Sequence, residues 1–296
     1  MKKNNSNCPI CNNNNFRTDN LSSYIIGLRN DWKVMRCNYC SHRKLNYSLE
    51  SGEINVLYSN GYFTPTEISE LSLTKISACY IDNEVILRKN KFLSTVTRLR
   101  NMTFANASFL DIGAATGEVV KIANEIGFNA EGVELSDYAI ETAKEKNNII
   151  LQKKKINELS SDKYNIVHMN HVFEHLENPI EEIKNIRKIM KKNGILYIEI
   201  PLQFNLVDTT KGWHNKIRKF PPCEMTAHSI HHPHFYTKSG IQKLLTNNGY
   251  HIHRTELFSI ARYNPKSLLD FAMAAIWLTL AMLGHGNYIE IFAEKR

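Results

Sequence analysis

The stretch that most constrains the fold runs over residues 109–118, FLDIGAATGE. It has the pattern of a short buried strand with an acid, Asp111, at its end, followed by a tight turn bounded by Gly113 and Gly117. Apolar residues then recur at helical spacing as far as Gly127, so a helix is expected to begin at the turn. Glycines let the backbone pass close to a ligand, and a helix N-terminus presents free N–H groups. Together they predict a nucleotide-binding corner.

A second acid supports this prediction. Glu134 lies 21 residues after Gly113, at the end of the expected strand 130–135. An acid at that distance is placed to accept hydrogen bonds from ribose hydroxyls. The dinucleotide fingerprint G-x-G-x-x-G is absent, because Ala115 and Glu118 occupy its second and third glycine positions. This difference argues against NAD or FAD.

From residue 109 onward, strand and helix patterns alternate, which is typical of a parallel sheet in an α/β protein. After the first strand, further strands are expected at 130–135, 149–151, 164–169, 195–200, 250–258 and 288–294. Helices are expected at 84–100, 136–143, 180–190 and 238–248. A long interruption at 202–240 should lie at the carboxyl edge of the sheet, over the ligand crevice.

The fourth strand is followed by the run NHVFEHL, residues 170–176, then by Asn178-Pro179 and a helix. A basic turn with Gly194 leads into a fifth strand that ends at Pro201. Over roughly residues 109–250, this order resembles the class I S-adenosylmethionine (SAM) methyltransferases. Their first motif, an acid followed by G-x-G-x-G, is present here with Ala115 in place of the central glycine.

The resemblance implies a doubly wound, seven-stranded Rossmann-like sheet of order 3-2-1-4-5-7-6, with the last strand antiparallel. Many relatives hold the adenine amino group with an acid after the third strand. Here that place is occupied by Lys155, so adenine recognition is expected to use Asn157 or backbone atoms. The residues implied to bind SAM are Asp111, Gly113, Ala115, Gly117, Glu134, Leu135, Asn157 and Asn170.

Two C-x-x-C pairs lie near the N-terminus, separated by 25 residues: Cys8, Cys11, Cys37 and Cys40. Each pair offers two thiolates, and four thiolates complete a tetrahedral zinc site. Because sulfur would fill every coordination position of the metal, the zinc is expected to be structural. The spacing leaves room for a hairpin, with 24–26 and 32–36 as candidate strands.

These patterns predict a zinc ribbon at 1–47, a helical connector at 48–108 and a methyltransferase domain at 109–296. The net charge of +8 accompanies a general richness in Asn, Lys and Ile without a dense basic run, so a nucleic-acid partner is not favoured. The start of the chain lacks an apolar signal segment, and paired C-x-x-C motifs are typical of metal sites in the cytosol. A cytoplasmic protein is therefore expected.

Methyl transfer to oxygen requires that the acceptor lose a proton, and histidine has a suitable pKa for the base. Eight of the twelve histidines lie between His168 and His234. His171 is the first candidate for the base and His175 the second, while His231, His232 and His234 could reach in from the long loop. For each single histidine, a packing role is the alternative. A metal bound by these histidines with Glu224 is not supported by the spacing.

The ribbon, an aromatic connector and the H-x-x-E-H run resemble a bacterial methyltransferase group found with surface-polysaccharide genes. This resemblance implies O-methylation of a sugar or glycan intermediate. The alternatives are deoxysugar C-methylation, rRNA methylation and a non-catalytic binding protein. The apolar segment 268–283 is open to burial, to homodimer formation or to peripheral contact with a membrane, and it would suit a lipid-linked acceptor.

Overall fold

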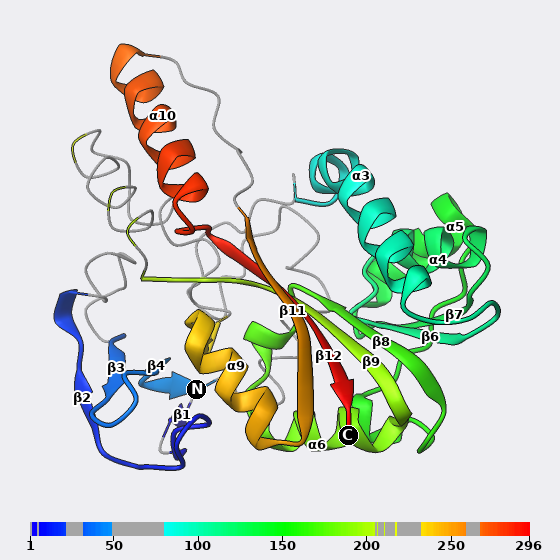
Figure 1. The fold of residues 1–296 in the computed structure, drawn as a ribbon, viewed down its shortest axis with the longest axis horizontal. Coiled ribbons are helices and arrows are strands. Elements are labelled where there is room, and N and C mark those ends of the chain that lie inside the picture. Colours follow the sequence, from blue (N-terminus) through cyan, green and yellow to red (C-terminus); the bar gives the residue numbers. More distant parts are fainter. Residues whose placement is uncertain are drawn as a thin grey trace.

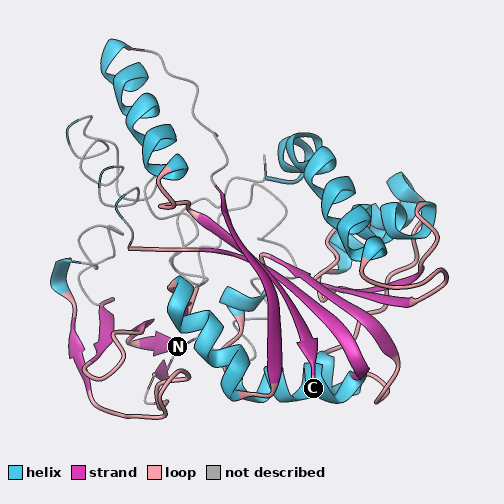
Figure 2. Ribbon diagram, in the orientation of Figure 1, coloured by secondary structure: helices cyan, strands magenta, loops and turns pink. Residues whose placement is uncertain are grey.

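The computed structural model describes residues 2–4, 6–21, 32–48, 80–204, 206, 210, 217, 232–258 and 267–296. A central sheet with helices on both faces forms the main body, and smaller sheets built largely from the N-terminal residues lie beside helix α9 (Figures 1 and 2).

The central sheet has six strands in the order β11-β12-β9-β8-β6-β7. Strands β7, β6, β8 and β9 are parallel, whereas β12 runs antiparallel between β9 and β11. The α/β Rossmann-like prediction is therefore confirmed. The strands are β6 (Ser108–Ile112), β7 (Asn129–Val133), β8 (Tyr164–Asn170), β9 (Met190–Pro201), β11 (Tyr250–Phe258) and β12 (Tyr288–Lys295).

The expected third strand is the main difference from the predicted sheet. Residues 149–151 form no strand, and beyond them only Gln152 makes an isolated parallel bridge to Val133. Ile150 is 83% exposed, and three lysines follow Gln152, so the apolar run is too short to hold a paired edge strand. The bridge still lies beside β7, where the expected order places strand 3.

Opposite faces of the sheet carry different helices. Residues of β6, β8 and β9 that point to one face pack in a single core with α6 and α9, whereas their neighbours pack with α3 and α4 on the other face. The helices are α3 (Tyr80–Asn101), α4 (Glu118–Glu125), α5 (Asp137–Asn147), α6 (Pro179–Ile189), α9 (Lys238–Asn247) and α10 (Leu268–Met282). Two short 3₁₀ turns, η3 (Ile156–Glu158) and η4 (Phe173–His175), follow the β7 bridge and β8.

A four-stranded sheet of order β10-β4-β3-β2 carries the N-terminal cysteines. Its edge strand β10 comes from nearly 200 residues later in the chain than its neighbour β4. His234 pairs with Lys44, and Phe235 pairs with Arg43. Cys8 and Cys37 also belong to the same apolar core as Ile241 of α9. The N-terminal unit is thus fixed to the main body. The strands are β2 (Phe16–Thr18), β3 (Val34–Cys37), β4 (Arg43–Leu45) and β10 (His234–Phe235), with β1 (Lys2–Lys3) and β5 (Tyr47–Ser48) in a separate pair.

Some predicted features of the N-terminal half lie outside the described residues. They are the candidate strand at 24–26, the aromatic connector at 58–65 and the single Cys79. The other candidate strand is confirmed in part, since β3 begins at Val34.

Helix α10 coincides with the predicted apolar segment and projects from the body in Figure 1. Apolar side chains along it, including Leu268, Phe271 and Leu278, are exposed, so the described residues do not bury it. None of the described helices has the length and apolar character needed to cross a bilayer.

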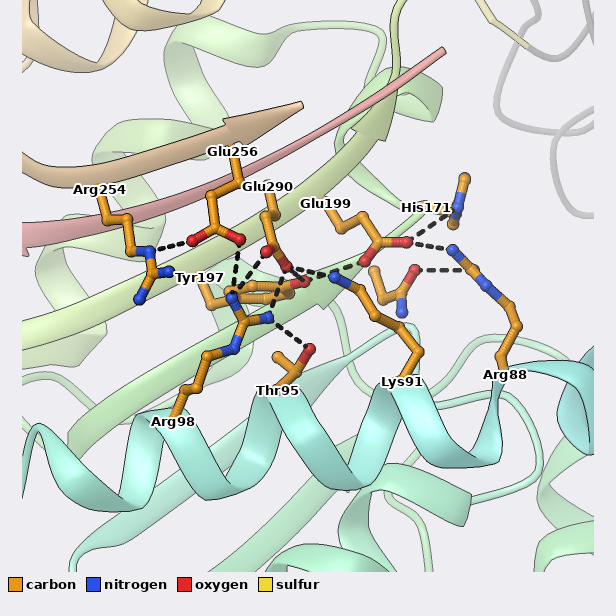
Figure 3. A network of polar contacts seen from close by, with 11 residues as sticks. Arg88, Lys91, Thr95, Arg98, His171, Tyr197, Glu199, Arg254, Glu256 and Glu290 are labelled. Atoms are coloured by element: carbon orange, nitrogen blue, oxygen red, sulfur yellow. Dashed lines mark hydrogen bonds and ion pairs between the residues drawn. The ribbon is translucent and has the colours of Figure 1, made fainter. Parts of the chain in front are cut away.

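Helix α3 is joined to the sheet by buried ion pairs (Figure 3). Arg98 donates to both carboxylate oxygens of Glu290 on β12, at 2.7 and 2.8 Å, and Lys91 donates to the same group at 2.6 Å. One strand away, Arg88 pairs with Glu199 of β9. The side chains of Glu199 and Glu290 are 0% and 1% exposed. Buried carboxylates without these cations would be very costly, so the network fixes the position of α3.

Acid should therefore weaken the fold through Glu290. Burial alone would raise its pKa, but Arg98 and Lys91 outweigh burial and hold the pKa at about 2. The unfolded chain then binds more protons, so the stabilisation is complete above about pH 5 and is lost as the pH falls towards 2. We expect Glu290→Gln to remove about 2 kcal/mol of this pH dependence, measured by urea unfolding at pH 6 and pH 3. Glu294→Gln, on the same strand but paired with the exposed His253, should leave it unchanged. Equal pH dependence in wild type and Glu290→Gln would contradict the assignment.

Candidate active site

The glycine turn between β6 and α4 requires left-handed backbone at three positions. Gly113, Ala115 and Gly117 have φ angles of 69°, 46° and 76°. A Cβ at Gly113 would lie 2.4 Å from a methyl of Val172, so only glycine fits there. Ala115 takes the same conformation as a non-glycine residue, which explains why glycine is the usual choice at this position. The turn here has alanine at its central left-handed position.

Glu134 is held against this turn by backbone amides. Its Oε2 accepts a hydrogen bond from the Ala115 amide at 2.9 Å, and its Oε1 accepts from the amides of Leu135 and Ser136 at 2.7 and 3.0 Å. Burial raises the pKa of Glu134, while the three amides act in the opposite direction. The carboxylate therefore joins the end of β7 to the turn. Ribose hydroxyls would meet it at this edge.

Asp111 lies inside the sheet rather than facing the crevice. Its Oδ1 is 2.7 Å from Nδ1 of His168 on the neighbouring strand β8, and both side chains are buried. The His168 ring stacks on Tyr197 with centroids 4.9 Å apart. In this structure Asp111 thus supports the strand that carries the turn.

The two asparagines predicted to bind SAM have different environments. Asn157 is exposed in η3, in the loop after the bridge to β7. Asn170 ends β8, and its Oδ1 accepts a hydrogen bond from Arg88 at 3.1 Å. Leu135 is partly exposed next to Glu134. The structure brings Glu134 and Leu135 to the turn, while Asn170 is held by α3.

His171 follows β8 with a left-handed φ of 54°, and its ring is surrounded by charge. Nδ1 lies 3.2 Å from Glu174 and Nε2 lies 3.4 Å from Glu199. Burial and the nearby Arg88 would lower the pKa of His171, but the two carboxylates outweigh them and raise it. Both ring nitrogens therefore face hydrogen-bond acceptors, which suits a donor rather than the predicted base. Figure 3 shows His171 beside Glu199.

A second group of polar side chains lies at the same edge. Glu174 and His175 come from η4, and His232 comes from the residues just before β10. Their possible ligand atoms all lie within 4.8 Å of one another. The sequence pointed to His175 and His232 separately. It gave no signal that Glu174 joins them, because the contact depends on pairing of β10 with β4.

His234, another predicted candidate, has a structural role. Its Nδ1 is 3.2 Å from Nε2 of His42, and its Nε2 is 3.3 Å from the carbonyl oxygen of Glu177. Burial lowers the pKa of His234 to about 4. It therefore joins the N-terminal sheet to the loop after η4. His231 and Glu224 lie outside the described residues.

The four N-terminal cysteines converge as a metal site requires. Their sulfurs lie within 4.8 Å of one another, with Cys8–Cys40 at 3.3 Å and Cys11–Cys37 at 3.6 Å. Sulfurs bound to one tetrahedral zinc at about 2.3 Å are about 3.8 Å apart, so only small movements are needed. Asn12 and Ser41, each directly after the second cysteine of a pair, have left-handed backbone. These residues fit a structural zinc.

The same edge of the parallel strands thus carries the turn, Glu134 and the histidines. Residues 86–255, more than half of the chain, match the family described as a methyltransferase domain. The chain belongs to this family. It is a SAM-dependent methyltransferase. No curated protein gives a significant match.

Solved methyltransferase structures share the fold at low identity. The plantazolicin methyltransferase BpumL, in complex with SAH, is 19% identical with a TM-score of 0.54, over 83% of this chain and 97% of that one. The magnesium protoporphyrin IX methyltransferase of Synechocystis PCC 6803, with bound SAH, is 15% identical with a TM-score of 0.52, over 71% and 84%. A SAM-dependent methyltransferase of Archaeoglobus fulgidus is 18% identical with a TM-score of 0.51, over 73% and 99%.

Proposed function

We propose that this methyltransferase transfers the methyl group of SAM to an oxygen of a sugar or surface-glycan intermediate. The observation that carries the proposal is the polar edge beyond β8, where His171, Glu174, His175 and His232 gather next to the SAM-binding turn. Sugars expose many hydroxyls, and a group of imidazoles and carboxylates can bind them and promote loss of a proton.

The SAM donor would lie across the turn at 113–117, with its ribose against Glu134. The protein mainly has to hold the donor methyl and the acceptor oxygen in line, since the positive sulfur already activates the methyl carbon. Asn157 stays the candidate for the adenine, and Asn170 would shape the methionine end. His171, with carboxylates at both nitrogens, would hold Glu174 and Glu199 in place rather than contact the acceptor. His175 and His232 are then the imidazoles left to promote deprotonation.

The N-terminal unit would act as a structural zinc ribbon that closes this edge. Strand β10 belongs to its sheet and lies two residues after His232, so the ribbon fixes part of the acceptor site. With four thiolate ligands the zinc has no open position for substrate. The exposed helix α10 would suit a lipid-linked acceptor, a membrane surface or a second copy of the chain.

Methylation of rRNA is the second candidate, because a related ribbon could bind RNA. Two of the ribbon's cations are not available to bind RNA. Arg43 is paired with Asp19 at 2.9 Å, and Lys44 is buried with its Nζ donating to the Ser6 carbonyl at 2.5 Å. Phosphate contacts need accessible Lys and Arg side chains.

Incubation of the purified protein with ¹³C-methyl SAM and fractionated cell extract tests the proposal. We expect label in the glycan fraction, with a carbon-13 NMR shift typical of a methyl on oxygen. A shift typical of a methyl on carbon would replace O-methylation by C-methylation, and label in RNA would support the second candidate. No label in any fraction, from a protein that binds SAM, would contradict catalysis of this kind.

A further inference from the structure

Glu174, His175 and His232 form a group with the composition of an open metal site. The first two are adjacent in η4, and the third is brought in by the pairing of β10 with β4. The possible ligand atoms of the three residues lie within 4.8 Å of one another, and the two imidazole rings are 4.8 Å apart at 74°. Ligands on one ion at about 2.0–2.2 Å are about 3–4 Å apart, so small side-chain movements would complete the site.

The carboxylate of Glu174 is an unusual buried group. The residue is 2% exposed, and Oε1 accepts from His171, but Oε2 has no hydrogen-bond partner within the described part of the chain. A buried carboxylate oxygen without a partner costs free energy. A cation bound to Oε2 would remove that cost.

His232 is 5% exposed, and its Nδ1 lies 3.3 Å from Nε2 of the Gln203 side-chain amide. With the amide turned so that its oxygen accepts from Nδ1–H, the Nε2 lone pair is directed to the ion. Gln203 would then be a positioning residue for this ligand.

We propose that Glu174, His175 and His232 bind a divalent first-row transition-metal ion. Two imidazoles and one carboxylate are typical ligands of such ions, and three protein ligands leave positions open, unlike the four-cysteine site. The role of this metal rests on the proposed function: its open coordination positions would take hydroxyl oxygens of the sugar acceptor.

A bound cation lowers the pKa of a coordinated hydroxyl, so its proton would pass to solvent and no histidine base would be needed. The acceptor oxygen then forms the new O–CH₃ bond, the S–CH₃ bond breaks, and its electron pair remains on sulfur in S-adenosylhomocysteine. His175 in this account is a ligand.

Titration of the zinc-loaded full chain with Co²⁺, without SAM or acceptor, tests the site. We expect one equivalent to produce visible d–d bands of a nitrogen and oxygen environment, without the intense sulfur-to-cobalt band that the four-cysteine site would give. His175→Ala and His232→Ala should weaken binding by at least about 100-fold, and Gln203→Ala by about tenfold. Gln203→Ala changes no proposed ligand, so it tests the site with little risk to the fold.

His253→Ala is the matched control, since it removes an imidazole of β11 that lies 2.7 Å from the carboxylate of Glu294 on β12. It should bind Co²⁺ like wild type. The proposal is overturned if wild type shows no d–d bands, if only the sulfur band appears, or if the two histidine variants bind like His253→Ala. SAM binding, by calorimetry, and methyl transfer, by labelling, are measured separately from cobalt binding. A protein that labels glycan but binds no cobalt therefore refutes the metal site alone.

Discussion

Replacing Glu134 by alanine should weaken SAM binding by at least about 100-fold. Its carboxylate would accept hydrogen bonds from two ribose hydroxyls, and each hydrogen bond to a charged group contributes about 1.5–3 kcal/mol. The same substitution leaves the buried amides of Ala115, Leu135 and Ser136 without their acceptor. The turn at 113–117 would therefore also lose its present shape, and both effects reduce affinity.

Calorimetry with SAM measures this effect, and Glu131→Ala is the matched control. Glu131 lies on the same strand, β7, but its carboxylate pairs with Lys163 at 2.5 Å and accepts from Gln152 at 3.0 Å. The control should bind SAM like wild type. Glu134→Gln, which keeps the shape of the side chain and loses its charge, should fall between the two. Thermal unfolding shows whether Glu134→Ala is still folded. A folded Glu134→Ala that binds SAM with wild-type affinity would refute the assigned role.

Much of the fold could be predicted from local patterns. Strand β11 has the predicted bounds, and the helix expected from residue 136 begins there, with the Ser136 side chain accepting from the Ala139 amide at 3.4 Å at the start of α5. Such features depend on a few neighbouring residues, so the sequence shows them directly. The third strand was predicted wrongly because Ile150 counts as apolar in a pattern but is exposed in the structure. Whether a short apolar run becomes a strand depends on what covers it.

The site was predictable only where its residues follow one another in the motif. Glu134 is predicted as a ribose-binding residue from its distance to Gly113, and in the structure its carboxylate accepts from the Ala115 amide. Arg88 was missed although it pairs with Glu199, because the two are 111 residues apart and no local pattern connects them. For the same reason the sequence does not show that Glu199 lies beside His171, although Glu174, its other carboxylate neighbour, is only three residues away.

Loss of one cysteine of the proposed zinc ribbon should have the second large effect. We expect Cys37→Ser to lower the zinc content by about one equivalent and to unfold the ribbon. Zinc contributes on the order of 10–16 kcal/mol to the folding of small zinc-finger peptides, more than a ribbon of this size could supply from its own core. Because β10 pairs with β4, the position of His232 should be lost with it.

The substitution should also destabilise the main body without unfolding it. Cys8, Ile10 and Cys37 share an apolar core with Ile241 and Leu244 of α9, so the Cys37→Ser protein should melt several degrees below wild type. The turn and Glu134 lie on other elements, so SAM binding should be kept while methyl transfer is lost. Zinc analysis by mass spectrometry, thermal unfolding and SAM calorimetry measure the three effects. Cys223→Ser, the same exchange outside both C-x-x-C pairs, is the control and should keep its zinc. If Cys37→Ser keeps the full wild-type zinc content, or transfers methyl groups at the wild-type rate, the four cysteines do not form a metal centre that supports the acceptor site.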